Sequence, residues 1–202
     1  SDATGHPSIC MMQDGLVSMR HLSLPDTFLD VRQVFQLAMQ IHYLHKHPSQ
    51  RNFLIGEDGA DDLDLCAEAG FTIQRLPKPC ILKPRKLWSG KQVFSLLLPH
   101  INIDKGAHTA ESKNFDSSDK RLLIRDGHLL SGVLSKGDLG RANHSILQII
   151  AKDLPNGGRH VINFLSDAQR VAEYFWVNKG FSVGLDDIIV SPRTQDLLDQ
   201  MT

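Results

Sequence analysis

The sequence has only three cysteines in 202 residues, almost no net charge and no long apolar run. Cys10, Cys66 and Cys80 are odd in number and far apart, which argues against a disulfide scaffold and predicts reduced, buried thiols in a cytosolic or nuclear protein. A formal net charge of -1 excludes a global positive field, so any nucleic-acid contact must be a local patch. Since no apolar run approaches ~18 residues, we expect no membrane span.

The composition is otherwise that of an ordinary globular protein. It is 41% hydrophobic and 22% charged, and 202 residues can bury a substantial core as one large domain or as a domain with an extension. The first ten residues, "SDATGHPSIC", lack both an initiator methionine and the layout of a signal peptide. We therefore expect a segment of a longer polypeptide.

The first quarter of the chain predicts one clear helix. Apolar side chains recur at helical spacing in residues 31–47, Asp30 is a good N-cap, and Pro48 ends the predicted helix. Before this helix we expect, in chain order, a short strand at 8–12, a short helix at 13–21, a break at Pro25 and a short strand at "TFL".

Residues 48–80 differ from the segments on either side. They contain the acidic run "EDGADDLD" and several other polar residues. Loops of this length are uncommon inside compact domains and are often additions. We predict a surface insertion here, with one short helix near residues 61–69.

The second half of the chain predicts helices together with a hairpin. Ser89 can cap a helix through Leu98, and "RLLIRDGHLLSGVL" indicates two strands joined at Asp126–Gly127. Because strands do not alternate regularly with helices, we expect an α+β fold rather than a doubly wound sheet. The other expected features are a flexible polar segment at 106–120, a turn at "SKGDLG", helices at about 144–153 and 158–179, Gly180 as a C-cap, and a last helix from Pro192.

The stretch "SGKQ" looks like the tail of a phosphate-binding loop, but the motif is incomplete. Such a loop needs a glycine five positions before the Gly-Lys pair, so that successive N–H groups can surround phosphates. Arg85 stands at that position, and Gln92 replaces the hydroxyl side chain that binds magnesium. We therefore exclude a phosphate loop here.

Potential metal ligands lack the spacing of a metal site. His42, His45 and His47 have no cysteine or carboxylate at metal spacing, so solvated histidines are expected. The run "EDGADDLD" lacks the spaced ligands and terminal glutamate of an EF-hand loop. Asp116 and Asp119 could hold magnesium, but exposed carboxylates in a polar loop are the favoured interpretation. No nucleophile–base arrangement is evident, so we expect no catalytic and no metal-binding residue.

Four segments between about residues 9 and 191 carry a family resemblance. They are "MMQDGLVSMRHLSLPDTFLD", "KPRKLWSGKQVFSLLLPHIN", "LLIRDGHLLSGVLSKGDLG" and "DAQRVAEYFWVNKGFSVGLDD". In content and order they resemble the largest subunit of multisubunit DNA-directed RNA polymerases, in its eukaryotic, archaeal and viral version more than its bacterial one. The second segment contains the family pattern KP-x-x-LW-[ST]-GKQ in full.

The resemblance implies the α+β pore domain of that subunit in residues 1–185 and the start of the funnel in 186–202. In that family these regions border the channel through which nucleotides enter and backtracked RNA leaves. The family's "NADFDGD" loop, whose aspartates hold Mg²⁺, is not in this sequence. We therefore expect a fragment, inactive alone, of the enzyme that makes RNA from nucleoside triphosphates on DNA, with the Mg²⁺ ligands outside this fragment.

The resemblance also implies partners and a location. The partners are other polymerase subunits, the second-largest foremost, together with template DNA, RNA and nucleoside triphosphates, and no membrane. The location is the nucleus, or the host cytoplasm if the polymerase is viral. The alternative is a stand-alone interaction module that binds polymerase subunits or transcription factors without catalysis. A reading frame extending upstream through "NADFDGD" would favour the first interpretation, and a native start and stop near these termini the second.

The resemblance implies that the segment "KPRKLWSGKQ" is a structural element that packs this domain under the active centre. Pro84 is expected to fix an extended approach, and Trp88 to anchor the core. The cations Lys83, Arg85, Lys86 and Lys91 are either solvated or placed to neutralise nearby nucleic acid, and a scaffolding role is favoured over direct contact. The structural residues assigned to this motif are Lys83, Pro84, Trp88, Gly90, Lys91 and Gln92.

The turn after the hairpin is the best candidate for contact with RNA or substrate phosphates. The resembled family carries a Lys-Lys pair there, facing the pore. Lys136 takes the place of the first lysine, Gly137 removes the second, and Arg141 could restore the lost charge. A phosphate contact by Lys136 would be a screened point charge. An ordinary exposed turn lysine is an equally good interpretation.

Overall fold

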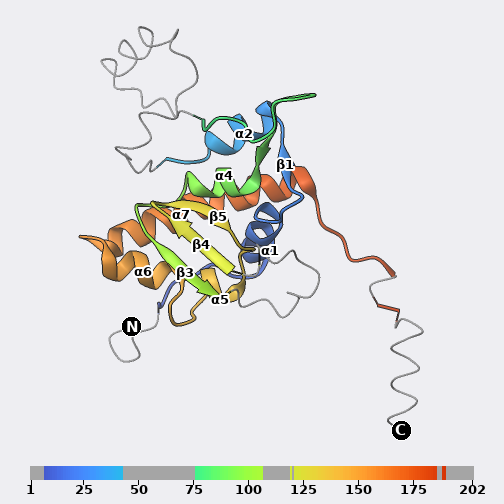
Figure 1. Cartoon of the computed structure of the whole chain (residues 1–202). Helices are drawn as coiled ribbons and strands as arrows, with labels where there is room; N and C mark the ends of the chain where they lie inside the picture. The colour runs from blue at the N-terminus through green and yellow to red at the C-terminus, as the bar shows by residue number, and fades with distance from the viewer. Residues whose placement is uncertain (1–6, 43–75, 107–118, 120, 186–187, 190–202) are drawn as a thin grey trace, which may run out of the picture.

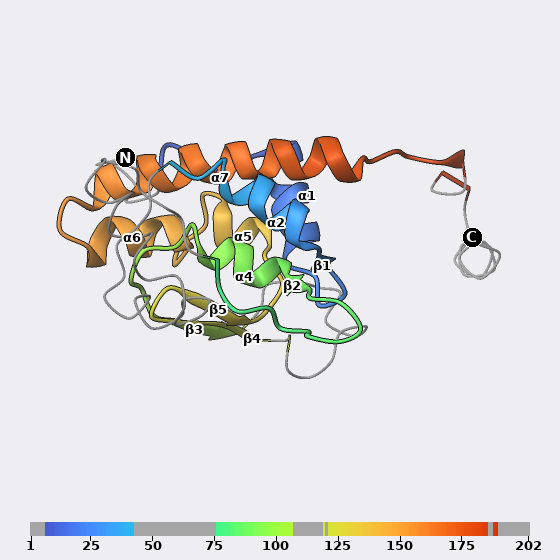
Figure 2. The ribbon, with the colours of Figure 1, turned by 90° about the horizontal axis from the view of Figure 1, so that it is seen from above.

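A long helix, α7, lies on one side of the domain, a three-stranded sheet lies on the other, and short helices lie between them (Figure 1, Figure 2). This computed structural model describes residues 7–42, 76–106, 119, 121–185 and 188–189. In chain order the elements are α1 (Gln13–Leu22), β1 (Phe28–Leu29), α2 (Val31–Ala38), β2 (Trp88–Ser89), α4 (Gly90–Ser95), β3 (Ile103–Gly106), β4 (Arg121–Arg125), β5 (His128–Ser131), α5 (Lys136–Leu139), α6 (Ile146–Asp153) and α7 (Gly157–Lys179).

Both sheets are antiparallel, which confirms the α+β class. Strand β1 pairs with β2, and β3, β4 and β5 are neighbours in that order. The β4–β5 hairpin turns at Asp126 and Gly127, as predicted, with φ of 49° and 73°. Positive φ at both central residues is what a two-residue hairpin turn requires, and the Asp-Gly pair tolerates it.

Helix α7 supplies one wall of the core and contacts α1, α2 and α6. The Phe94 ring of α4 meets the Phe164 ring of α7 edge to face, with centroids 6.2 Å apart. Ser18 Oγ donates a 2.8 Å hydrogen bond to the carbonyl oxygen of Ala172, which links α1 to α7 across 154 positions of sequence. Gly180 ends the helix with φ of 72°, as predicted. The buried apolar residues of α7 are Phe164, Ala168, Val171, Ala172 and Phe175.

The helix predicted for residues 31–47 is shorter than expected. Asp30 caps it as predicted, in a capping box with Gln33, but α2 ends at Ala38. After a turn, the His42 backbone N–H donates to Asp167 Oδ1 of α7 at 3.1 Å. This tertiary hydrogen bond directs the backbone away from the helix axis. The apolar periodicity of the segment cannot reveal such a contact, because the acceptor lies far along the chain. Residues 43–47 lie outside the described residues.

Other local predictions were also wrong in part. The strand expected at 8–12 is absent, and Met11 N–H instead donates to the carbonyl oxygen of Leu139. Helix α4 ends at Ser95 and a turn replaces its expected continuation to Leu98. The strands β2 and β3 were not predicted, and the turn expected at "SKGDLG" contains the short helix α5. Helices α6 and α7 confirm the predictions for 144–153 and 158–179.

Cysteine burial differs from the prediction. Cys80 is exposed and Cys10 is half-buried, and both are free thiols. Cys66, the short helix near 61–69 and the helix expected from Pro192 lie outside the described residues. Within the described part of the chain, no helix combines the length and the apolarity that crossing a membrane requires.

Candidate functional site

The indole of Trp88 anchors the "KPRKLWSGKQ" motif in the core, as predicted. Trp88 is only 3% exposed, and its Nε1–H donates a 2.6 Å hydrogen bond to the carbonyl oxygen of Pro77. Gln92 Nε2 donates to the carbonyl oxygen of Lys78 at 2.9 Å. Both acceptors belong to residues 77 and 78, which precede the motif in the chain. Trp88 and Gln92 therefore hold this preceding segment against α4.

Ser89 and Gly90 start helix α4 and seat it against α1. Ser89 Oγ accepts from the Gln92 backbone N–H, and Gln92 Oε1 accepts from the Ser89 backbone N–H, which makes a capping box. A Cβ at Gly90 would lie 1.8 Å from the carbonyl oxygen of Leu22. Gly90 N–H donates to the carbonyl oxygen of Thr27 at 3.1 Å. Glycine is therefore required here by close backbone approach.

The Lys91 side chain is largely buried and forms an ion pair inside the domain. Its Nζ lies 2.5 Å from Asp119 Oδ1, and the two side chains are 14% and 9% exposed. The same carboxylate oxygen accepts from the Gly132 backbone N–H at 3.0 Å. The preferred interpretation of Asp119 as an exposed carboxylate was therefore wrong, whereas the buried ion pair agrees with the structural role assigned to Lys91. The interpretation of Asp119 failed because the pairing joins residues 28 positions apart.

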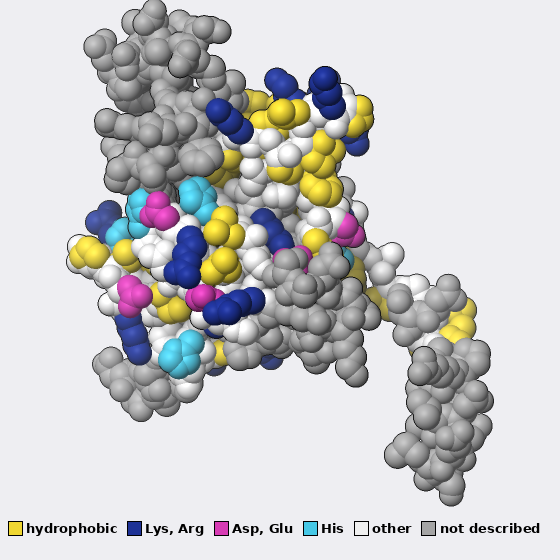
Figure 3. All heavy atoms as spheres, viewed as in Figure 1, with side chains coloured by type: hydrophobic (Ala, Val, Ile, Leu, Met, Phe, Trp, Pro, Cys, Tyr) yellow, Lys and Arg dark blue, Asp and Glu magenta, His cyan; other side chains and the backbone are white. Residues whose placement is uncertain are grey.

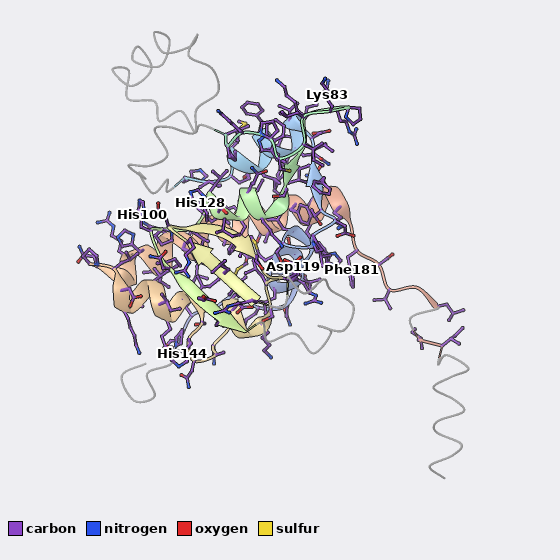
Figure 4. All side chains as sticks on the ribbon, viewed as in Figure 1. Lys83, His100, Asp119, His128, His144 and Phe181 are labelled. Carbon is purple, nitrogen blue, oxygen red and sulfur yellow. The ribbon has the colours of Figure 1, made fainter. Side chains whose placement is uncertain are left out.

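Lys83 lies at the tip of a loop that precedes β2 (Figure 4), and both Lys83 and the adjacent Pro84 are exposed. The loop is closed at its base by Ile81 and Leu87, whose backbone N–H groups donate to each other's carbonyl oxygens at 3.1 and 2.9 Å. The Lys83–Pro84 peptide bond is cis, and the chain bends there. The expected extended approach at Pro84 was therefore wrong, because the bridge at the base folds this stretch back on itself. Arg85 and Lys86 are also exposed.

Lys136 is the first residue of α5, and its side chain is exposed. Ser135 caps this short helix by accepting from the Gly137 N–H, while Asp138 Oδ2 accepts from the Ser135 backbone N–H at 2.9 Å. A Cβ at Gly140 would lie 2.4 Å from the Lys136 carbonyl oxygen. The Ser135 cap and Gly140 together fix the backbone of α5, from which the Lys136 side chain projects.

Near α5, Lys136 and Arg141 are cations whose charge no described carboxylate neutralises. Asp138 is 1% exposed and forms an ion pair with Lys105, with Nζ–Oδ1 at 2.7 Å. Lys105 Nζ also donates to the carbonyl oxygen of His144 at 3.0 Å. Arg141 is exposed, and within the described part of the chain neither it nor Lys136 has an ion-pair partner. Both side chains could therefore receive a phosphate.

Sequence reasoning missed the residues that support this turn. Lys105, which directly precedes the segment 106–120 that was expected to be flexible, was given no role, and Asp138 was only part of the expected turn "SKGDLG". The signal that could have found Asp138 is its spacing, because an acidic residue three positions after Ser135 matches the pattern of a capping box. No local signal connects Lys105 to Asp138, since they are 33 positions apart.

The described residues do not supply a metal centre. They contain no group of three or more His, Cys, Asp or Glu side chains placed to hold a metal ion. His42 Nδ1 lies 2.6 Å from Arg170 Nη1, so a cation already stands beside that ring. His45, His47 and Asp116 lie outside the described residues. Asp119 is held by Lys91 and by the Gly132 N–H, so it does not fit the role of a magnesium ligand.

His21 lies where α1 meets the end of α7. Its ring is 5.5 Å from the Trp176 ring, which in turn stacks on Phe181 at 5.2 Å. Burial, together with the positive charges of Lys179 and Arg20, lowers the pKa of His21, and Asp26 opposes this shift. The neutral imidazole is therefore the favoured form in the folded protein.

A hollow of about 270 Å³ opens beside this junction. It lies between the β1–α2 region and the last turns of α7, and its walls are mixed polar and apolar. No sequence pattern indicated it, because its two sides are far apart in the chain. Its lining residues are Asp26, Thr27, Phe28, Leu29, Gln33, Gln36, Leu37, Tyr174, Phe175, Asn178 and Lys179.

Comparison with known proteins identifies relatives of nearly the whole chain. Residues 1–188 match the family described as RNA polymerase Rpb1, domain 3. The chain is 34% identical over 188 residues to DNA-directed RNA polymerase II subunits RPB1-A and RPB1-B of Trypanosoma brucei brucei. It is 28% identical over 194 residues to DNA-directed RNA polymerase III subunit RPC1 of Homo sapiens.

These alignments cover 93% and 91% of this chain but only 9% and 12% of the Trypanosoma and human relatives. The chain thus spans about a tenth of the length of the curated relatives that it matches. The matched region contains the buried motif around Trp88 and the capped turn at Lys136. The resemblance inferred from the four sequence segments is confirmed, and the chain belongs to the RNA polymerase Rpb1, domain 3 family.

Proposed function

We propose that the chain is a segment of the largest subunit of a DNA-directed RNA polymerase and that it lines the channel for entering nucleotides and backtracked RNA. The whole enzyme would synthesise RNA from nucleoside triphosphates on a DNA template. The observation that carries this proposal is the family match over residues 1–188. The segment itself contributes walls and contacts rather than chemistry.

The proposed contact residues are Lys136 and Arg141. Both are exposed cations on a backbone that the Ser135–Asp138 capping box and the Lys105 ion pair hold in place. Such a cation can attract the phosphates of a nucleotide or of displaced RNA. Because the side chains are solvated, each contact would be modest and screened by salt.

Magnesium, partners and location belong to the same proposal. Catalytic Mg²⁺ would be held by aspartates outside this segment, where it stabilises charge on the transferring phosphates. The partners would be other polymerase subunits, the second-largest foremost, together with template DNA, RNA and nucleoside triphosphates. The relatives are subunits of eukaryotic polymerases II and III, which supports a nuclear location. A boundary between pore and funnel at residues 185 and 186 stays a prediction.

The first test is the mass of the native polypeptide, detected with an antibody raised against this chain. We expect a product well above the 22.6 kDa of these 202 residues, and we expect it to co-purify with template-dependent RNA synthesis. A native product near 22.6 kDa without that activity would contradict the proposal. It would support the alternative, an interaction module without catalysis.

The second test is Lys136→Ala in the assembled polymerase. Removing one solvated phosphate contact should weaken retention of backtracked RNA by about threefold to tenfold, or about 1 kcal/mol, with normal assembly. Lys152→Ala is the matched control, because Lys152 is an exposed lysine on α6. Pausing and transcript-cleavage assays measure the effect. Equal behaviour of the Lys136 and Lys152 variants would exclude a role for Lys136 at the channel.

A further inference from the structure

The segment from Pro77 to Pro99 contains positively charged side chains and no negatively charged ones. It contains no Asp or Glu in a chain whose net charge is only -1. Its five cations are Lys78, Lys83, Arg85, Lys86 and Lys91. Lys91 differs from the other four, because its charge is neutralised by Asp119.

The remaining four cations are all exposed. Within the described part of the chain, Lys78, Lys83, Arg85 and Lys86 have no ion-pair partner, and three of them lie in the loop 82–86. Figure 3 shows Lys and Arg side chains gathered at this end of the molecule, and Figure 4 shows Lys83 at the loop tip, pointing away from the body. The loop therefore presents concentrated positive charge to solvent.

The base of the loop is held by several hydrogen bonds. Besides the paired backbone of Ile81 and Leu87, the Cys80 thiol donates to the Leu87 carbonyl oxygen at 3.3 Å. Trp88 and Gln92 also hold residues 77 and 78 in place, by donating hydrogen bonds to the carbonyl oxygens of Pro77 and Lys78. Since the base is fixed, the cations are brought together before any ligand arrives, which lowers the ordering cost of binding.

This loop is separate from the turn that carries Lys136. In Figure 1 the loop and α5 lie at opposite ends of the domain. A single short contact therefore cannot include both the loop and α5 (Figure 1). The charge on the loop is therefore not explained by the contacts proposed for Lys136 and Arg141.

We infer that the loop 82–86, together with Lys78, is a second binding site for the phosphodiester backbone of nucleic acid. A phosphate backbone is a dense row of negative charges that Lys and Arg neutralise with release of counterions. An acidic protein partner fits less well, because the cores of protein interfaces are depleted in lysine and built on apolar anchors. Leu82 is the one aliphatic side chain in the loop. This inference does not depend on the catalytic activity of any larger assembly.

The test compares two triple variants of the whole 202-residue chain that lose the same charge. The loop variant is K83Q/R85Q/K86Q. The control variant is R32Q/K152Q/R159Q, which removes three exposed cations from α2, α6 and α7. Circular dichroism first establishes that both variants fold as the parent does. Binding of fluorescein-labelled oligouridylate is then measured by anisotropy across a range of salt concentrations.

The expected result is selective loss of binding in the loop variant. Three lost phosphate contacts should reduce the slope of log K against log salt by about 2 and lower affinity by roughly tenfold to a hundredfold near 0.1 M salt. The control variant should stay within about threefold of the parent. Oligodeoxythymidylate and duplex DNA, measured in parallel, distinguish RNA from DNA as the source of the backbone.

Three outcomes would overturn the inference. The first is absence of measurable oligouridylate binding by the parent chain at low salt. The second is an equal loss in the loop and control variants, which would indicate net charge alone. The third is displacement of oligouridylate by polyglutamate as effectively as by unlabelled oligouridylate, which would indicate an acidic protein as the partner.

Discussion

At the scale of single residues, Gly90 is the position where one added methyl group should do most harm. Its Cβ would lie 1.8 Å from the Leu22 carbonyl oxygen, which belongs to the buried last residue of α1. A backbone oxygen cannot yield as a flexible side chain can. We expect Gly90→Ala to lower the free energy of unfolding by about 3 kcal/mol, measured by urea denaturation, since overpacking of a core costs this much.

Gly158→Ala is the matched control for this prediction. A Cβ at Gly158, near the start of α7, would meet no heavy atom within 4 Å. Alanine there should leave stability unchanged or raise it by about 0.5 kcal/mol, because glycine loses more backbone entropy on folding. Equal stability of the Gly90 and Gly158 variants would show that α1 and α4 do not approach as closely as described.

His21 makes stability depend on pH in a direction that follows from its surroundings. Burial and the nearby positive charges of Lys179 and Arg20 lower its pKa in the folded protein below 6.5, the ordinary value for a histidine. The unfolded chain therefore binds more protons than the folded chain as pH falls below this value. The contribution of neutral His21 should be present above pH 6.5 and be lost as pH decreases from there towards the lowered pKa.

NMR titration of the His21 ring measures this pKa directly, and His21→Asn identifies its resonance. The urea midpoint of the parent should fall more steeply below pH 6.5 than that of the variant. The comparison isolates one ring among ten histidines. A His21 ring whose pKa is 6.5 or higher would contradict the prediction.

At the scale of elements, the Lys91–Asp119 pair joins helix α4 to the β4–β5 hairpin. Asp119 precedes β4, and Gly132, whose N–H it also accepts from, follows β5. Removing the ammonium leaves a buried carboxylate with one N–H donor. We expect Lys91→Met to cost about 3 kcal/mol of unfolding free energy, near the lower end for broken buried pairs because both groups retain slight exposure.

A double variant separates the charge pair from simple packing. In K91M/D119N, the neutral amide oxygen can still accept from the Gly132 N–H, so the double variant should be more stable than Lys91→Met alone by about 1 kcal/mol. Lys152→Met, on the exposed face of α6, should change stability by less than about 0.5 kcal/mol. A double variant as unstable as the sum of its single changes would mean that the pair is not coupled.

Elements with local signals were predictable, and elements made by distant contacts were not. Helix α7 has apolar periodicity and a C-cap glycine within its own sequence, and the β4–β5 hairpin has its Asp-Gly turn. The end of α2 was wrong because Asp167, far along the chain, accepts from the His42 N–H. Strands β2 and β3 are short, and their hydrogen-bonding partners lie in other segments.

The same distinction between local signals and distant contacts applies to the candidate site. Trp88 was predicted as a core anchor from residue type and position, and its burial confirms this. The exposure of Lys136 agrees with both interpretations of that turn, so its contact with RNA stays a prediction. The ion pairs of Lys91 and Lys105 could not be predicted, because charge in a sequence does not show which carboxylate a fold will bring to it.

At the scale of the whole molecule, the first and last described helices close the fold together. Helices α1 and α7 pack side by side, and the Ser18–Ala172 hydrogen bond crosses most of the chain length. Helices α1, α2 and α6 all contact α7. Because this core includes five buried apolar residues from α7, the preceding elements cannot bury their apolar surface without it.

Truncation tests this dependence on α7. A chain ending at Leu154 keeps every described strand but lacks α7, so we expect it to show no cooperative thermal transition and to bind the dye ANS through exposed apolar surface. A chain ending at Ile189 keeps all the described elements and should melt within about 3 °C of the parent. Circular dichroism and calorimetry measure both. A cooperative transition in the shorter chain would show that the elements before α7 form a core of their own, and that α7 is an appendage rather than the helix that completes the domain.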